Sequence, residues 1–242
     1  MSERKGSIGN ARILPKEVPT PIYSITPFTL LDYPGKTACI LWFAGCNMRC
    51  TYCYNPDIVL GKGVVSIMEA LTFLRSRKGL LQGIVLSGGE CTLHPTVFPL
   101  LETAKEYGFD VKIDTNGSRP KVLERLIARR LVDYIALDFK ALEHRYQAIT
   151  ESTLFPEFAE SLSLLNCSSV PFELRTTVHS ELITRDDLRA MVGFLQQHAY
   201  SGPYYIQHYV NGVPVLGKLC RSIKYAHFSE LSVDGIAVVE RG

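Results

Sequence analysis

The chain has 242 residues, of which 46% are hydrophobic and 21% charged, and it carries a formal net charge of +2 and seven cysteines. A chain of this length buries about 70% or more of the surface that its unfolded form exposes, so a sizeable core needs no disulfide bonds. The weak positive charge is spread along the sequence without a lysine or arginine run, so the electrostatic signature of nucleic-acid binding proteins is missing. One globular domain is the prediction.

The sequence contains no targeting or membrane segment that we can recognise. Its apolar runs are far shorter than a membrane span, and its first twenty residues are polar and contain proline without an apolar signal core. We therefore expect a cytoplasmic protein with no membrane association. In a reducing compartment, an odd number of cysteines indicates metal ligands and free thiols rather than a disulfide framework.

Six short, nearly continuous apolar runs are predicted to be strands. They cover residues 38–43, 83–86, 109–113, 132–137, 172–178 and 204–207. Such runs are typical of strands buried on both faces of a parallel sheet. The stretches between them repeat apolar residues at helical spacing, and Ser66 with Glu69 and Thr184 with Asp187 resemble capping boxes. Alternating strands and helices predict a parallel sheet with helices outside, as an open barrel or a doubly wound sheet, with ligands at the carboxyl ends of the strands.

Three cysteines follow the first predicted strand in a CxxxCxxC pattern: Cys46, Cys50 and Cys53. Three thiols within eight residues of a loop can surround one small metal centre, and thiolates select zinc, copper(I) or iron–sulfur clusters. A structural zinc site needs four closed ligands. A cuboidal iron–sulfur cluster with three cysteines keeps one iron open to another ligand. Cysteines that merely pack in a core have no reason to cluster at this spacing.

At these residues the chain resembles the radical S-adenosylmethionine superfamily, whose hallmark is CxxxCxΦC with an aromatic residue at Φ, here Tyr52. The resemblance implies a [4Fe–4S] cluster held by the three cysteines, with S-adenosylmethionine chelating the fourth iron. It also implies that Tyr52 lies near the adenine. The other four cysteines are expected to be dispensable for the cluster: Cys39, Cys91, Cys167 and Cys220.

The second predicted strand is followed by Gly88, Gly89 and Glu90. Two glycines let the backbone approach a ligand closely, and a carboxylate can accept from an ammonium group. By itself this triplet is more often an ordinary turn. Its position after the second strand resembles the GGE motif of the superfamily, which contacts the methionine amino group of S-adenosylmethionine.

The next two strand ends carry Asp114 with Asn116 and Asp138 with Lys140. Each aspartate or asparagine alone is commonly a turn former. Together, DTNG and LDFK at these positions resemble the branch that activates glycyl radical enzymes, in which they contact the ribose and the methionine carboxylate. Lys140 suits a carboxylate, and Asp114 and Asp138 suit ribose hydroxyls or a monovalent cation.

Two later strands carry further polar candidates. Arg175 lies inside an apolar run and needs a partner. The resemblance places it against the cofactor, whereas strand alternation leaves a structural salt bridge with Glu173 as an alternative. His208, after the sixth strand, stands near a position that contacts adenosine in relatives, and its alternative is a structural or surface histidine.

Residues 28–36, FTLLDYPGK, resemble the segment with which activating proteins of anaerobic ribonucleotide reductase and pyruvate formate-lyase begin, although a proline-glycine turn alone has the same pattern. The expected domains are an N-terminal extension over 1–27 and one radical S-adenosylmethionine domain over 28–242. Tyr54 departs from the histidine that many relatives carry after the third cysteine.

The resemblance implies a partial (β/α)6 barrel that cleaves S-adenosylmethionine to a 5′-deoxyadenosyl radical and installs a glycyl radical on a partner enzyme. Its implied electron donor is a flavodoxin or ferredoxin-type protein, and no nucleic-acid partner is expected. Two alternatives stay open. One is a radical S-adenosylmethionine enzyme that modifies a peptide, nucleotide or RNA, and the other is a non-catalytic zinc-binding domain.

Overall fold

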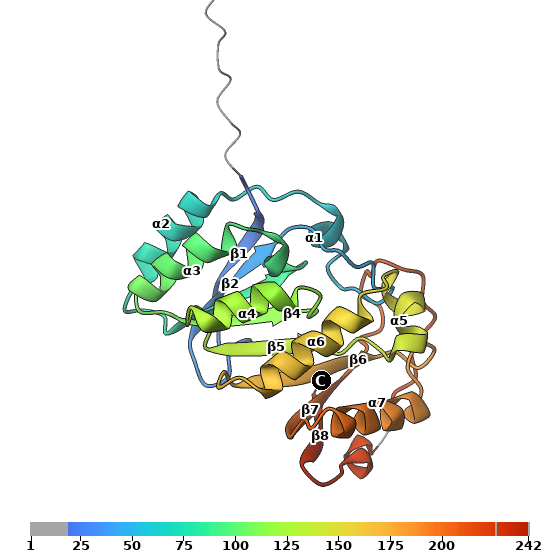
Figure 1. Cartoon of the computed structure of the whole chain (residues 1–242). Helices are drawn as coiled ribbons and strands as arrows, with labels where there is room; N and C mark the ends of the chain where they lie inside the picture. Colours follow the sequence, from blue (N-terminus) through green and yellow to red (C-terminus); the bar gives the residue numbers. More distant parts are fainter. Residues whose placement is uncertain (1–18, 226, 242) are drawn as a thin grey trace, which may run out of the picture.

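The computed structural model describes residues 19–225 and 227–241, which form one curved sheet of eight strands with helices on its outer side (Figure 1). The strands neighbour one another in chain order. Only β1 is antiparallel to its neighbour, and every later pair is parallel. The strands are β1 (Ile22–Thr29), β2 (Ala38–Phe43), β3 (Gly83–Gly88), β4 (Asp110–Thr115), β5 (Tyr134–Asp138), β6 (Phe172–Val178), β7 (Gly202–His208) and β8 (Ile236–Arg241).

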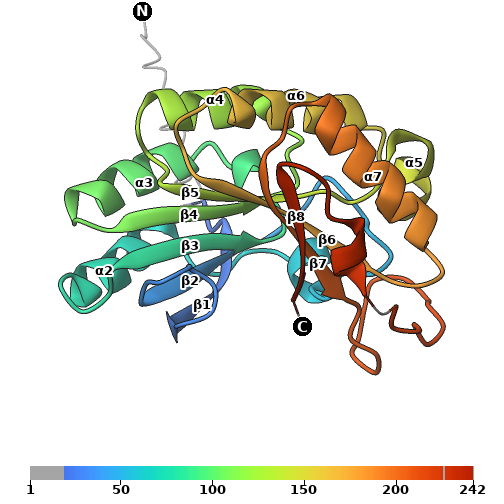
Figure 2. The same ribbon diagram turned by 90° about the horizontal axis from the view of Figure 1, so that it is seen from below.

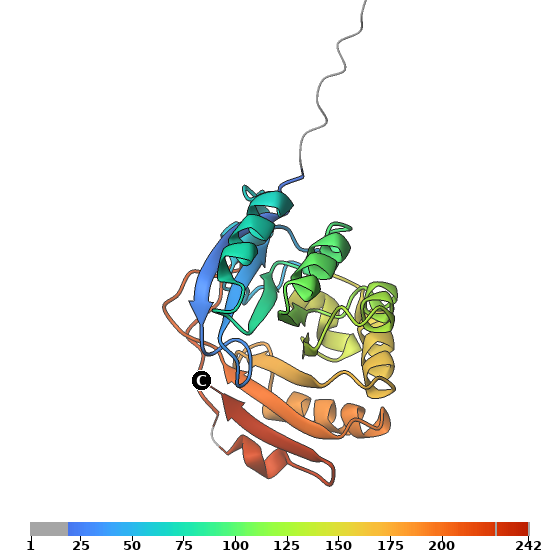
Figure 3. The ribbon, with the colours of Figure 1, turned by 90° about the vertical axis from the view of Figure 1, so that its left-hand side faces the viewer.

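The sheet curves into a barrel that does not close. Strands β1 and β8 form its two edges and do not pair with each other. In Figure 3 the blue β1 and the red β8 lie on the same side of the molecule, opposite the outer helices. The predicted partial barrel with mainly parallel strands is therefore confirmed.

The six predicted strands are all present, but both edge strands were missed. Strand β1 has mixed polar and apolar residues with Pro27 inside it, whereas β8 has a short apolar run, residues 236–239, in which buried and exposed side chains alternate. Edge strands are half solvated and give a weaker signal. Because β1 begins at Ile22, residues 22–27 of the expected N-terminal extension belong to the sheet.

Most of the helices cover the convex face of the sheet (Figure 2). Ser66 and Thr184 begin α2 and α7 with capping boxes, as predicted. No helix within the described ranges is long and apolar enough to span a membrane. The helices are α1 (Pro56–Leu60), α2 (Ile67–Arg77), α3 (Val97–Glu106), α4 (Pro120–Ala128), α5 (Glu143–Thr150), α6 (Phe155–Asn166) and α7 (Arg185–Gln197), with 3-10 turns η1 (Cys91–Leu93) and η2 (Phe228–Leu231).

The two faces of the sheet have different chemistry. The main apolar core lies between the outer face and the helices. Inside the barrel the described residues form a small apolar cluster around Tyr33, Ile40 and Val85. Buried charged residues such as Lys112 and Glu173 also occupy strand positions. Burying charges is costly unless they are paired, so the inner face marks the functional side of the sheet.

Candidate active site

A cavity of about 490 Å³ lies inside the barrel and reaches the carboxyl ends of the parallel strands. This volume is within the range of small-molecule sites. Every residue predicted for the site lines this cavity except Glu90: Cys46, Cys50, Tyr52, Cys53, Gly88, Gly89, Asp114, Asn116, Asp138, Lys140, Arg175 and His208.

Further lining residues were not singled out from the sequence. Gln207 ends the predicted strand 204–207, and Ser87 directly follows the predicted strand 83–86, so strand alternation is the signal that could have found them. Trp42 lies within the apolar run of the predicted strand 38–43, so its type alone does not distinguish it from the core residues of β2. Asp32 lies in the segment 28–36 that resembles activating proteins, although no role was expected for its side chain, and Arg241 lies on β8, which was not predicted.

Neighbouring backbone holds the cysteine loop after β2 in place. Gly45 N donates to Ile58 O at 2.9 Å, and Arg49 N donates to Thr150 O at 2.8 Å. The Arg49 guanidinium also donates through Nη1 to the carbonyl oxygens of Cys46 and Met48, at 2.7 and 2.8 Å. The loop is thus fixed by contacts within the protein, which lowers the entropic cost of ordering it around a ligand.

The three clustered thiols sit in a largely apolar setting. Burial raises the pKa of Cys46 to about 12 and also raises that of Cys50 above its ordinary value. A bound cationic metal centre would reverse this preference, because coordinated thiols are deprotonated. Among the described residues, no three His, Cys, Asp or Glu side chains are close enough to share one metal ion. All three thiols line the same cavity.

Asn116 links the loop after β4 to the cysteine loop. Its Nδ2 atom donates to Asn47 Oδ1 at 3.0 Å and to the sulfur of Cys46 at 3.8 Å. Asn47 in turn donates to Ser118 Oγ at 2.8 Å. Asn116 therefore connects two loops through its side chain, which goes beyond the turn formation expected of a lone asparagine.

Gly88 and Gly89 are required by packing within the protein. Gly88 has φ +110°, and a Cβ atom on it would lie 2.7 Å from Phe43 O. A Cβ atom on Gly89 would lie 1.8 Å from Gly45 O. The glycines therefore let the end of β3 lie directly against the start of the cysteine loop, while both still line the cavity.

Glu90 does not line the cavity, in contrast to the expectation from the GGE motif. Its side chain is fully buried and accepts four hydrogen bonds: from Thr92 N and Oγ1, from Thr115 Oγ1 and from Asn116 N. Burial raises its pKa, although these donors act in the opposite direction. Glu90 thus ties the loop after β3 to the loop after β4 and orients Asn116.

Asp114, Asp138, Lys140 and Arg175 form one charged network across β4, β5 and β6. Arg175 Nε lies 2.5 Å from Asp138 Oδ1, and its Nη2 lies 3.3 Å from Asp114 Oδ2. Lys140 Nζ lies 2.9 Å from Asp138 Oδ2. Burial alone would raise the pKa of Asp138, but the charges of Arg175 and Lys140 outweigh it and hold that pKa far below its usual range. Lys112 pairs with Asp114 as well, so three cations face two carboxylates, which favours an anionic ligand.

The alternative partner suggested for Arg175 is wrong. Glu173 accepts instead from both Nη atoms of Arg241 at 2.9 Å and from Tyr134 Oη at 3.1 Å. Alternation correctly places Glu173 on the same strand face as Arg175. Arg241 lies on an edge strand that was not predicted. Its ion pair with Glu173 could therefore not be inferred from the sequence.

Tyr52 presents an unsatisfied polar atom at the site. Its hydroxyl is buried and has no hydrogen-bond partner, and Lys140 Nζ lies 5.8 Å from its ring centroid. A buried hydroxyl without a partner is costly, and a ligand that supplied one would remove that cost. Tyr54, which replaces the histidine of many relatives, stacks on Tyr209 and accepts from Val210 N at 2.7 Å.

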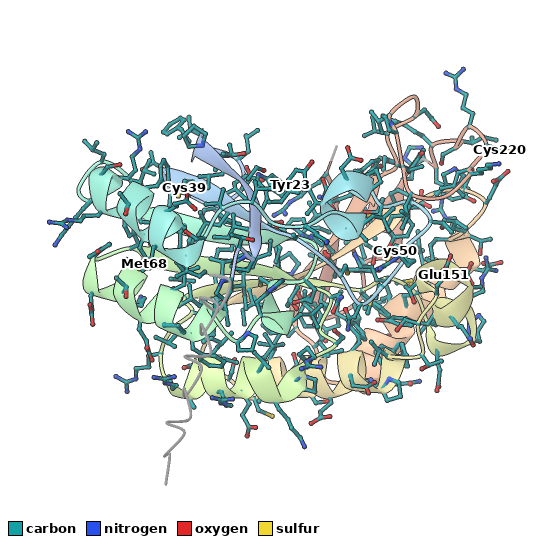
Figure 4. All side chains as sticks on the ribbon, turned by 90° about the horizontal axis from the view of Figure 1, so that it is seen from above. Tyr23, Cys39, Cys50, Met68, Glu151 and Cys220 are labelled. Atoms are coloured by element: carbon teal, nitrogen blue, oxygen red, sulfur yellow. The ribbon has the colours of Figure 1, made fainter. Side chains whose placement is uncertain are left out.

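His208 lines the cavity at the end of β7 but has protein partners of its own. Its Nε2 atom lies 3.4 Å from Glu240 Oε2, and its ring lies 5.2 Å from that of Phe228. The structural alternative for His208 therefore has support beside the cofactor-binding one. The cysteines outside the cluster motif are elsewhere, and Cys39 and Cys220 both lie apart from Cys50 in Figure 4.

A model of the Radical SAM superfamily matches residues 40–182. A protein of Methanocaldococcus jannaschii named as a glycyl-radical enzyme activating enzyme is 33% identical over 177 residues, which are 69% of this chain and 72% of that protein. The pyruvate formate-lyase-activating enzyme of Clostridium pasteurianum is 33% identical over 137 residues, or 53% of this chain and 56% of the relative. The chain thus spans about half the length of this second relative.

Solved structures agree on the fold. SuiB of Streptococcus suis superposes on 82% of this chain and 47% of its own with a TM-score of 0.64, at 14% identity. The structure of SuiB bound to S-adenosylmethionine gives the same TM-score over 84% of this chain and 52% of SuiB. At this identity the likeness supports the partial barrel alone.

Proposed function

Because this chain belongs to the radical S-adenosylmethionine superfamily, we propose that it installs a glycyl radical on a partner enzyme. One observation carries the proposal: an unclosed barrel whose inner cavity combines three clustered thiols with a charged network of strand ends. Asp32 and Arg241 line that cavity from the two unpaired edges of the sheet. A loop of a macromolecular substrate can reach the cavity from that side.

Cys46, Cys50 and Cys53 would hold a [4Fe–4S] cluster. They lie on one fixed loop beside the cavity, and Asn116 donates to the sulfur of Cys46. The chemistry that such a cluster supplies in this superfamily is the reductive cleavage of S-adenosylmethionine to methionine and a 5′-deoxyadenosyl radical. The chain itself positions both reactants and excludes water from them.

The remaining cavity residues would bind S-adenosylmethionine. Lys140 suits the methionine carboxylate, because the charged network has an excess of positive charge. The backbone at Gly88 and Gly89 would face the amino group. The carboxylates of Asp114 and Asp138 would accept from ribose hydroxyls, or hold a monovalent cation beside Arg175.

Three other residues complete the proposed cofactor site. The unpaired Tyr52 hydroxyl would receive a partner near the adenine, and His208 would contact adenosine. Asn116, which donates to the sulfur of Cys46, would contact the cofactor. Glu90 acts through Asn116, whose backbone N–H it accepts at 2.8 Å, and is therefore a positioning residue in this proposal.

Relatives named as glycyl-radical enzyme activating enzymes or pyruvate formate-lyase-activating enzymes support the proposed partner. A flavodoxin or ferredoxin-type protein in the cytoplasm would donate the electron. A second candidate is supported by the GTP 3′,8-cyclase of Chlorobaculum tepidum, which is 29% identical over 72% of this chain and 55% of its own. Under that reading the substrate is a nucleotide.

The test is anaerobic reconstitution with iron and sulfide, followed by measurement of 5′-deoxyadenosine with dithionite as reductant. We expect cleavage by the wild type and none by Cys50→Ala. Adding a candidate glycyl radical enzyme should produce the doublet of a glycyl radical in electron paramagnetic resonance. If a nucleotide stimulates cleavage and no protein partner acquires a radical, the nucleotide reading replaces ours. Wild-type cleavage by Cys50→Ala would exclude both.

A further inference from the structure

The most basic stretch of the chain forms one exposed surface outside the cavity. Residues 119–130 contain five basic residues and one acidic residue, Glu124. They comprise α4 and its flanking residues, on the outer side of the sheet in Figure 2. The basic side chains are all exposed: Arg119, Lys121, Arg125, Arg129 and Arg130.

A groove of about 360 Å³ runs between this helix and the segment that leads into α3. Its lining includes Arg119, Arg125 and Arg129, with Phe98 as an aromatic floor. The guanidinium carbons of Arg125 and Arg129 lie 4.5 and 5.6 Å from the ring centroid of Phe98. These contacts hold the arginines in place. We call this surface, lined by residues of 92–98 and 119–129, the α4 groove.

Both walls of the α4 groove are connected by hydrogen bonds to residues near Cys46, one of them through the neighbouring residue Ser118. On one wall, Arg119 follows Ser118, whose hydroxyl accepts from Asn47 at 2.8 Å. On the other wall, His94 Nε2 lies 2.9 Å from Ala44 O. Only a few bonded contacts therefore separate the groove from a predicted cluster ligand.

We propose that the α4 groove is the docking surface for an acidic one-electron carrier protein that reduces the cluster. The inference rests on the proposed function, since it needs a cluster at the three cysteines. In the step, the carrier is oxidised by one electron and the cluster is reduced by the same electron, with no bond made or broken. Complementary charge speeds such encounters and orients the partners.

The location also separates reduction from the radical chemistry. None of the residues that line the α4 groove lines the catalytic cavity. A carrier docked in the groove leaves the cavity and the open barrel edge free for the cofactor and the substrate. Electron delivery can then occur while the substrate is already bound.

A second basic surface, on the loop over residues 209–221, is less suitable. It carries Lys218 and Arg221 and reaches the cysteine loop through the backbone, where Leu216 N donates to Cys53 O at 3.1 Å. The same loop includes Val210, which lines the catalytic cavity. A protein docked there would cover the cavity, so this surface serves as the matched control.

The test compares Arg119→Glu/Arg125→Glu with Lys218→Glu/Arg221→Glu, which change the net charge equally. With limiting reduced flavodoxin, the first variant of the reconstituted enzyme should form 5′-deoxyadenosine about tenfold more slowly than wild type, and the wild-type rate should fall with added salt. With dithionite all three proteins should react alike. Arg119→Gln/Arg125→Gln repeats the test without added negative charge, in case the reversal disturbs α4.

Calorimetric binding of flavodoxin to metal-free protein gives a readout that needs no cluster. We expect weaker binding for the α4 variants only. Equal losses in both double variants, or wild-type flavodoxin affinity in the α4 variants, would overturn the docking surface. If wild type fails to cleave S-adenosylmethionine even with dithionite, the proposed function is wrong. The binding of flavodoxin to metal-free protein then still shows whether the carrier docks in the α4 groove.

Discussion

The carbonyl oxygen of Gly45 occupies the position that a side chain on Gly89 would need. A Cβ atom built on Gly89 lies 1.8 Å from that oxygen, far inside any real contact, and Glu90 N donates to the same oxygen at 2.9 Å. The end of β3 and the start of the cysteine loop are therefore locked together by backbone alone. The glycines of the GGE motif are therefore needed for this close backbone contact even without a ligand.

Gly89→Ala should destabilise the metal-free protein by about 3 kcal/mol or more, because the new methyl group forces backbone to move. The cysteine loop would shift with it, so iron loading should fall too. Chemical denaturation and iron content after reconstitution measure the two effects. The control is Gly193→Ala, where nothing lies within 4 Å of the added atom. In the interior of α7 this change should stabilise the protein by about 0.5–1 kcal/mol.

Glu90→Gln should destabilise the protein by about 1–3 kcal/mol, because one of four converging donors would meet an amide N–H₂ instead of an acceptor. We also expect weaker binding of S-adenosylmethionine through displacement of Asn116, measured by calorimetry on reconstituted protein. Glu124→Gln on the exposed face of α4 is the control. Unchanged stability of the Glu90 variant with a loss of affinity would mean that Glu90 contacts the ligand directly.

Arg175→Met should cost about 2 kcal/mol of stability near neutral pH, because it leaves two partly buried carboxylates without their shared partner. The pKa values of Asp114 and Asp138 are held low in the folded protein. Their contribution is therefore present above the unfolded value of about 3.9 and is lost as pH falls through the folded pKa values.

Without the guanidinium, burial raises the same two pKa values, and the variant takes up protons as the solution is acidified. The gap in unfolding free energy between wild type and Arg175→Met should then narrow from about pH 7 to about pH 4.5. Denaturation of metal-free protein at several pH values measures it. Arg189→Met removes an exposed ion pair and should show no such trend. A gap that stays constant would show that Arg175 does not hold the two aspartates ionised.

Only three of the seven cysteines should matter for iron. Cys39 and Cys91 are buried, so alanine is the appropriate replacement, whereas Cys167 and Cys220 are exposed and tolerate serine. Each of these four variants should keep wild-type iron and acid-labile sulfide after anaerobic reconstitution. Cys50→Ala should lose most of both. Loss of sulfide in any of the four would add a ligand to the predicted set.

Some features of this protein can be predicted from short stretches of its sequence. The six central strands are continuous apolar runs, and the capping residues Ser66 and Thr184 act within four residues of themselves. The CxxxCxxC spacing and the polar strand ends are also local patterns. Because parallel strands in order bring their carboxyl ends to one rim, these patterns together predict a common cavity, and the structure has one.

Other features depend on which residues meet across the sheet. The partner of Arg175 is decided by the register of β5 against β6, in which Asp138 stands opposite it. Glu173 pairs with Arg241, which lies at the end of β8, a strand that was not predicted. Glu90 points away from the cavity because four donors from two loops converge on it, although its motif resembles one that contacts a ligand.

The sequence by itself thus determined which chemical groups this chain holds, its thiols, carboxylates and glycines, and where its six central strands lie along the chain. Tertiary structure alone decided which charges pair, which carboxylate faces the cavity and that the basic residues around α4 form one groove beside the cysteine loop. The physical reason is the separation along the chain over which each kind of interaction acts. Periodicity and spacing act over a few residues, whereas charge pairing and burial are set by contacts between segments far apart in the chain.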